Sequence, residues 1–78
     1  MQITVRYFAA LREARGCDEE ALGVAEGTPV SELYQQIFAD SPLSGLRVMF
    51  AVNQGYVSAT HPLSDGDEVA FIPPLGGG

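Results

Sequence analysis

The sequence predicts an α+β fold in which one main helix packs on one face of a mixed sheet of four or five strands. Three stretches of the chain support this prediction. Residues 2–8 place apolar side chains at every second position, as a half-buried strand does. Residues 28–40 carry apolar side chains at helical spacing, and residues 47–72 largely return to the two-residue period.

The N-terminal third of the chain predicts a hairpin with a long connection. In the first strand one side is formed by Ile3, Val5 and Tyr7, and the other by Thr4, Arg6 and Phe8. Residues 9–15 predict one or two helical turns before Gly16. A weaker second strand is expected within residues 19–25, which also alternate.

The main helix is predicted between Thr28 and Asp40. Thr28 is a favourable N-cap, and Pro29 suits the first helical position because its missing amide donor is not needed there. The helix is expected to end near Asp40, before Pro42. Its apolar side is formed by Val30, Leu33, Tyr34, Ile37 and Phe38. This spacing predicts one continuous apolar stripe that packs against the sheet.

Three further strands are predicted in the C-terminal half. Residues 47–53 alternate, and Gln54-Gly55 is expected to form the turn into a short strand at residues 56–58. A turn at residues 64–67 precedes the last strand. In that strand Val69 and Phe71 face one side, and Ala70 and Ile72 face the other. The order β-β-α-β-β-β fits one helix laid across a mixed sheet, which is a β-grasp arrangement.

The C-terminal residues are the strongest candidates for the working part of the chain. Residues 1–74 are predicted to form one β-grasp domain, and residues 75–78 a flexible glycine tail. Glycines lack a Cβ atom and can enter a narrow channel. The tail would carry the Gly78 carboxylate on the order of 13 Å beyond the domain. The alternative is that these glycines are only a frayed end or an expression remnant.

Composition and charge argue against several classes of function. A chain of 78 residues has little room for an enclosed active site, so an enzyme that acts alone is disfavoured. The formal net charge of -6 repels the phosphates of nucleic acids. No apolar run is long enough to span a membrane and no signal peptide is recognisable, so we expect no membrane partner and a cytoplasmic location. Cys17 and His61 are each single, so no metal site is expected.

A docking surface is expected on the face of the sheet that the helix leaves uncovered. Alternation places Phe8, Ala70 and Ile72 on this face, in strands that are neighbours in a β-grasp sheet. Leu75 would extend the apolar contact toward the tail, and Met49 would join it with weaker support. An exposed apolar patch usually marks a partner. The alternative is that Phe8 and Ile72 are scattered surface residues or part of a minor second core.

Several short motifs carry a family resemblance. They are Ala51-Val52-Asn53-Gln54, His61-Pro62-Leu63, the run from Asp65 to Pro74 and the terminal Gly77-Gly78, with weaker support from Tyr7-Phe8-Ala9. Together they resemble the small, sulfur-carrier subunit of molybdopterin synthase, a family with a ubiquitin-like β-grasp fold. The thiamine-pathway sulfur carrier shares this fold and the terminal Gly-Gly, but the turn at residues 65–69 and the double proline favour the molybdopterin family.

The resemblance implies a sulfur carrier in molybdenum cofactor biosynthesis. An ATP-dependent activating enzyme would adenylylate the Gly78 carboxylate, which would then become a thiocarboxylate and donate its sulfur to the pterin precursor in the large synthase subunit. Gly77 would occupy the narrow channel, and Gly76 and Leu75 would contact the partner. Gly76 departs from the family, which more often has a non-glycine residue there. The resemblance also implies a heterotetramer whose small subunit binds no cofactor and is not an enzyme alone.

Three other functions remain open from the sequence. A sulfur carrier of the thiamine pathway and a ubiquitin-like protein modifier would both use the same terminal glycine. A purely structural interaction domain would not need the tail at all. The chain contains no lysine, so it cannot accept an isopeptide bond on a side chain, although it can donate its C-terminus.

Overall fold

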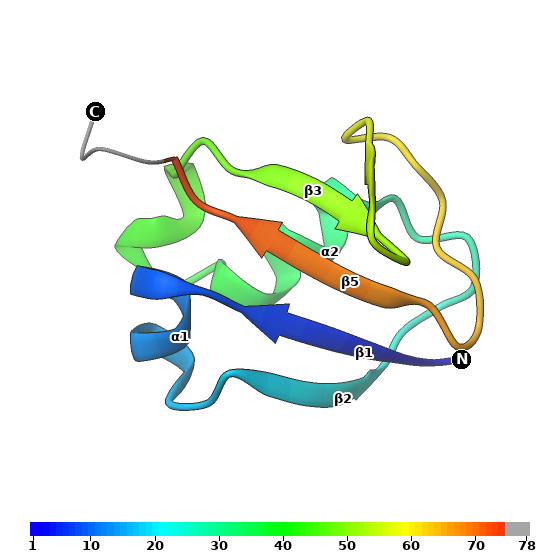
Figure 1. Cartoon of the computed structure of the whole chain (residues 1–78), viewed down its shortest axis with the longest axis horizontal. Coiled ribbons are helices and arrows are strands. Elements are labelled where there is room, and N and C mark those ends of the chain that lie inside the picture. Colours follow the sequence, from blue (N-terminus) through cyan, green and yellow to red (C-terminus); the bar gives the residue numbers. More distant parts are fainter. Residues whose placement is uncertain (75–78) are drawn as a thin grey trace.

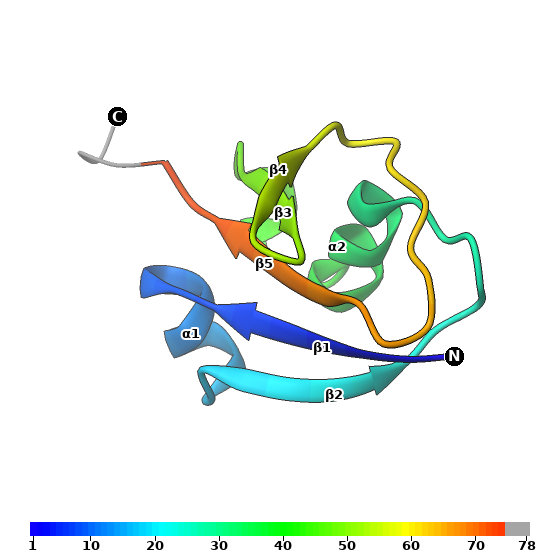
Figure 2. The same cartoon turned by 45° about the vertical axis from the view of Figure 1, so that its right-hand side comes forward.

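The computed structural model describes residues 1–74 and contains a five-stranded sheet in the order β2-β1-β5-β3-β4 (Figure 1). In chain order the elements are β1 (Gln2–Tyr7), α1 (Ala9–Arg15), β2 (Glu19–Gly23), α2 (Val30–Phe38), the 3₁₀ helix η1 (Pro42–Gly45), β3 (Met49–Val52), β4 (Gly55–Val57) and β5 (Glu68–Ile72). Helix α2 covers one face of the sheet, whereas the described helices leave the other face open (Figures 1 and 2). The predicted β-grasp fold is confirmed.

The centre of the sheet is a parallel pair formed by the first and last strands. Strand β1 pairs with β5 from Thr4–Glu68 to Tyr7–Phe71. All other neighbouring strands are antiparallel, so the sheet is mixed as predicted. Because parallel neighbours run in the same direction, the C-terminal ends of β1 and β5 lie at the same end of the sheet.

The core forms between the sheet and α2. Most of its buried members lie at the inward positions of the strands or on the apolar stripe of α2, and Leu11 of α1 joins them. They include Ile3, Val5, Tyr7, Leu11, Val30, Leu33, Tyr34, Phe38, Val69 and Phe71. Tyr34 packs with its ring centroid 4.8 Å from Phe38 and 5.0 Å from Phe71. The Tyr34 hydroxyl donates a 2.6 Å hydrogen bond to the Leu43 carbonyl, so this buried phenol keeps a polar partner.

The start of α2 differs by one residue from the prediction. Pro29, not Thr28, is the N-cap residue, and no side chain caps the helix. The Thr28 hydroxyl instead donates to the Ala25 carbonyl at 2.7 Å. The Val30 and Ser31 amides donate to the carbonyls of His61 and Ala59 at 2.9 and 3.0 Å. A distant loop therefore supplies the acceptors that an N-cap side chain normally provides.

The turn between β3 and β4 lies one residue earlier than predicted. Asn53 and Gln54 have φ angles of 51° and 71°, and Gly55 already pairs with Val52. Positive φ at both central residues is typical of the two-residue turn whose twist matches that of the flanking strands. The prediction had placed Gly55 in the turn, where glycine is usually favoured.

A short 3₁₀ helix after α2 was not predicted. Helix α2 ends at Phe38, and η1 follows from Pro42. Ser41 caps η1, because its hydroxyl oxygen accepts a 3.0 Å hydrogen bond from the Leu43 amide.

Within residues 1–74, no helix is long and apolar enough to cross a membrane.

Candidate functional site

The predicted tail falls beyond the part of the chain that the structure describes. The site residues Leu75, Gly76, Gly77 and Gly78 lie outside residues 1–74. The described chain leaves the sheet at Ile72 and continues through Pro73 and Pro74. Strand β5 thus ends at the same end of the sheet as β1, next to Phe8, which follows β1.

The structure places Phe8, Ala70 and Ile72 on the open face, as predicted. Phe8 follows Tyr7 in an extended conformation, with φ of -129° and ψ of 151°, and therefore points away from the buried Tyr7 ring. Ala70 and Ile72 alternate with the fully buried Val69 and Phe71. Phe8, Ala70 and Ile72 together line one hollow of about 290 Å³.

The apolar surface is wider than these three residues. We call it the open-face patch; its members are Phe8, Met49, Ala51, Tyr56, Ala70 and Ile72. Met49 belongs to it because it lies directly opposite Ile72 in the ladder between β3 and β5. Three of its side chains are strongly exposed: Phe8 by 42%, Met49 by 56% and Tyr56 by 68%. Such a grouping is unusual on a monomeric surface and is suited to binding another protein.

Sequence reasoning missed Tyr56 and Ala51. Tyr56 lies directly opposite Ala51 in the hairpin, so both side chains point to the open face. The alternation that places Met49 and Ala51 on one face also indicates Tyr56, because a two-residue turn at either 53–54 or 54–55 leaves residue 56 opposite a residue of that face. The prediction did not continue this alternation into the short strand at residues 56–58.

Charged residues border one side of the patch. Arg6 and Glu68 line the same hollow, and their side chains approach to 3.9 Å. Both side chains are more than one third exposed, so this pair contributes little to stability. The patch therefore combines an apolar centre with charges that can pair with a partner.

The Arg15 guanidinium is held within the fold. It donates to the Glu20 carboxylate at 2.6 Å, and the Tyr7 hydroxyl donates to the same oxygen at 2.6 Å. Burial raises the pKa of Tyr7, and the hydrogen bond to Glu20 raises it further. Burial also acts to raise the pKa of Glu20, but the bonds from Tyr7 and Arg15 outweigh it and lower that pKa overall. This cluster stabilises the ionised carboxylate and joins β1, α1 and β2.

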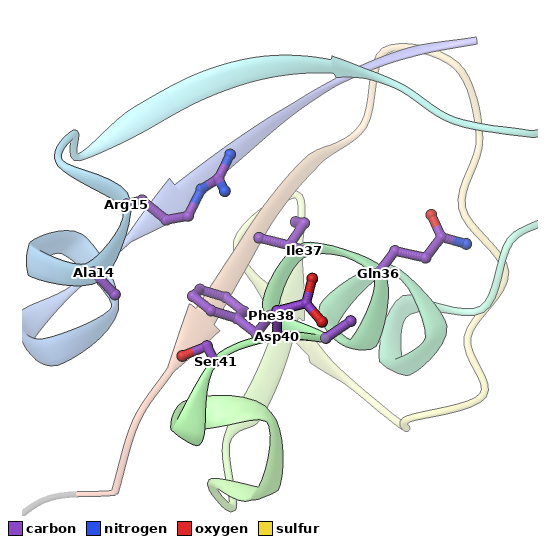
Figure 3. A pocket seen from close by; sticks show the side chains of 8 residues that line it. Ala14, Arg15, Gln36, Ile37, Phe38, Asp40 and Ser41 are labelled. Carbon is purple, nitrogen blue, oxygen red and sulfur yellow. The ribbon is translucent and has the colours of Figure 1, made fainter.

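A second hollow, of about 250 Å³, lies between α1 and the end of α2 (Figure 3). Arg15, Gln36, Asp40 and Ser41 contribute its polar side chains. Two of these are engaged in the fold, since Arg15 binds Glu20 and Ser41 caps η1. This hollow offers no arrangement to which we assign chemistry.

Residues 1–74 contain no group of three or more histidine, cysteine, aspartate or glutamate side chains that could hold a metal ion. Cys17 is a free thiol that is partly buried and packs against the core. The feature of this part of the chain that is suited to binding is therefore the open-face patch.

Comparisons with known proteins show which family the sequence resembles. Residues 5–78 match the model of the ThiS family. The molybdopterin synthase sulfur carrier subunit of Chlamydomonas reinhardtii is 45% identical over 83 residues, with all of both chains covered. The protein of the same name from Escherichia coli strain K12 is 46% identical, with 97% of this chain and 99% of that protein covered.

Solved structures show the same fold. A molybdopterin converting factor subunit 1 from Pyrococcus furiosus matches with a TM-score of 0.82 and 32% identity, covering 96% of this chain and 99% of that chain. A complex of subunits 1 and 2 of the molybdopterin-converting factor from Helicobacter pylori contains a chain with a TM-score of 0.65 and 25% identity, with both chains fully covered. A ubiquitin from Caldiarchaeum subterraneum, at 19% identity and a TM-score of 0.64, shows the fold alone and confirms that it is ubiquitin-like.

Proposed function

The chain belongs to the ThiS family, and within it to the molybdopterin synthase sulfur carrier subunits, and we propose that it carries sulfur on its C-terminal glycine. The Gly78 carboxylate is the carrier group, and the sulfur is delivered to a pterin precursor during molybdenum cofactor biosynthesis. The observation that supports this most directly is the match over the full length of named sulfur carrier subunits in a chain that ends in Gly77-Gly78.

The chemistry requires activation by a partner. An α-carboxylate has an ordinary pKa of about 3.3 to 3.7, so at neutral pH it is an anion and a poor electrophile. An ATP-dependent activating enzyme transfers AMP to Gly78 and releases pyrophosphate. A sulfide then attacks the carbonyl carbon and displaces AMP, which leaves the thiocarboxylate directly. A persulfide on a donor protein would displace AMP to form an acyl disulfide, and a thiol would then cleave its S–S bond, releasing the thiocarboxylate and forming a disulfide with the donor's own sulfur.

The open-face patch docks the carrier on its partners. It lies beside the point where β5 ends, so a protein that covers Phe8 and Ile72 also receives the residues that follow Pro74. The Helicobacter pylori relative is a complex of two subunits, which supports a large-subunit partner for this chain. We expect Leu75 and Gly76 to extend the contact and Gly77 to pass through the narrowest part of the channel.

The division of labour follows from this arrangement. The carrier supplies the acyl group and the docking surface, whereas the activating enzyme and the large subunit supply the acids, bases and oxyanion donors. The small subunit is thus not an enzyme alone and holds no cofactor. By family analogy, two small and two large subunits form the synthase.

Intact mass spectrometry tests the proposed carrier group. The chain is produced together with its activating enzyme and a sulfur donor, and we expect a species in which one C-terminal oxygen is replaced by sulfur. A variant that lacks Gly77 and Gly78 is the control, and it should gain no sulfur and support no molybdoenzyme activity in cells. Full molybdoenzyme activity with the shortened variant would refute the proposal.

Three further measurements in cells separate the other functions. Peptides in which Gly78 is joined to lysines of other proteins would identify a protein modifier. Restored thiamine synthesis without molybdoenzyme activity would identify a carrier of the thiamine pathway. Activity that does not depend on the last two glycines would identify a structural interaction domain.

A further inference from the structure

The residue directly after Phe8 has an unusual backbone conformation. Ala9 has a φ angle of 51°, in the left-handed region that residues other than glycine rarely adopt. The other non-glycine residues with positive φ in the described chain, Asn53 and Gln54, form a hairpin turn that requires it. Ala9 instead lies at the junction between a strand and a helix.

Two neighbouring residues require the chain to change direction at Ala9. Phe8 remains extended and continues β1. Leu11, only three residues further on, is completely buried in the core. The Phe8 carbonyl accepts hydrogen bonds from the amides of Leu11 at 3.0 Å and Arg12 at 3.4 Å. The first turn of α1 is therefore hydrogen-bonded to the backbone of Phe8.

This turn keeps Phe8 uncovered on the open-face patch. The last ladder pair between β1 and β5 is Tyr7 with Phe71, and Phe8 lies one residue beyond it. Because the chain turns into α1 immediately afterwards, the Phe8 ring stays at the border of the hollow that Ile72 also lines. A relaxed backbone at Ala9 would have to move either Phe8 or the buried Leu11.

We propose that Ala9 is a positioning residue, whose left-handed backbone holds Phe8 in the orientation that binds the large subunit. The inference rests on the proposed docking function of the open-face patch. Only the fraction of molecules that present Phe8 correctly can bind, so the apparent dissociation constant rises when that fraction falls.

Four versions of residue 9 test the role, with purified large synthase subunit as the binding partner. D-Alanine prefers positive φ and is introduced by ligating a synthetic peptide of residues 1–16 to residues 17–78 at the Gly16-Cys17 junction. We expect affinities within about threefold of each other for L-alanine, D-alanine and glycine. Ala9→Val should bind roughly five- to thirtyfold more weakly, because a β-branched residue disfavours positive φ.

Phe8→Ala variants show whether Ala9 acts through Phe8. In that background the difference in affinity between the alanine and valine versions of residue 9 should disappear, as a double-mutant cycle requires for coupled residues. If residue 9 served only the helix, D-alanine would weaken binding and lower the thermal midpoint, because a D-residue opposes a right-handed helix. That result overturns the inference even if the valine variant fails to fold.

The outcomes also separate this inference from the function on which it rests. Weak or absent binding by the unmodified chain would refute the docking function of the patch, and the role of Ala9 with it. Tight binding that depends on Phe8 but is unchanged by Ala9→Val would leave the docking function intact and refute only the positioning role.

Discussion

Glu20 shows how a single carboxylate joins three elements. It accepts hydrogen bonds from Tyr7 on β1 and from Arg15 on α1, both at 2.6 Å. Its pKa lies below the ordinary value of 4.5, so the fold favours the ionised form. The stabilisation is therefore fully present above the ordinary pKa and is lost as the pH falls through the lower pKa of the folded state.

Replacement of Glu20 by glutamine should remove this pH dependence. We expect Glu20→Gln to lower the free energy of unfolding at neutral pH by roughly 1 kcal/mol, because both donors lose a charged acceptor. Below pH 4.5 the difference from the unmodified chain should shrink. Urea unfolding across this range measures it, and Glu13→Gln on the exposed side of α1 is the control. Equal effects of the two substitutions would contradict the prediction.

Phe8 offers the residue-scale test of docking. Its ring is 42% exposed and lies outside the core cluster, so Phe8→Arg should change the free energy of unfolding by less than about 0.5 kcal/mol. Binding to the large subunit should weaken by about 2 kcal/mol or more, because a charge would replace an aromatic anchor. Calorimetric titration measures the loss.

Gln36→Arg is the matched control for Phe8→Arg. Gln36 is exposed on α2, over the opposite face of the sheet, and the substitution adds the same charge. We expect this variant to bind normally. A large loss of stability in Phe8→Arg would instead place the ring in a minor second core.

At the scale of elements, the hairpin of β3 and β4 is tied to the start of β5 by one side chain. Asn53 donates through its amide to Asp67 Oδ1 at 3.0 Å and accepts from the Glu68 amide at 3.0 Å. Asn53 and Asp67 belong to the motifs that carry the family resemblance. Their contacts show that these residues hold the fold together, whereas the residues of the open-face patch form the proposed site.

Substitution of Asn53 should loosen this connection. Asn53→Ala removes both hydrogen bonds and places alanine at a φ angle of 51°, so we expect the free energy of unfolding to fall by about 2 kcal/mol. Gln54→Gly is the control, because glycine accepts the φ angle of 71° without strain and should be neutral or slightly stabilising. Chemical denaturation measures both, and an equal loss in the two variants would argue against the role of the side chain.

Local sequence patterns predict the direction of side chains within a strand better than they predict contacts between distant segments. Alternation placed Phe8, Ala70 and Ile72 on the open face, where the structure also has them, because the side-chain direction in a strand follows from the two-residue period. Tyr56 was missed because the alternation of residues 47–53 was not continued across the turn; a two-residue turn shifted by one residue changes the partner of Tyr56 from Ala51 to Asn53 but not its face. The Thr28 cap was wrong because carbonyls from a loop distant in the sequence took its place, which no local pattern reveals.

At the scale of the whole molecule, the boundary between domain and tail remains a prediction. Within residues 1–74, the buried members of the core cluster run from Ile3 to Phe71. A chain that ends at Pro74 should therefore unfold cooperatively, with a free energy within about 0.5 kcal/mol of that of the full chain. Thermal and urea unfolding of the two chains test this, and a clear loss of stability would show that residues 75–78 contribute to the fold.

The parallel pairing of β1 with β5 also has a mechanical consequence. A force that pulls on Gln2 and Ile72 acts along the two strands in opposite directions, so it loads their hydrogen bonds in shear. Under shear the bonds share the load and must break together, whereas a zipper geometry breaks them one at a time. The domain should therefore resist unravelling when it is pulled between its first strand and the residues that follow Ile72, as would happen if a partner held both ends of the domain.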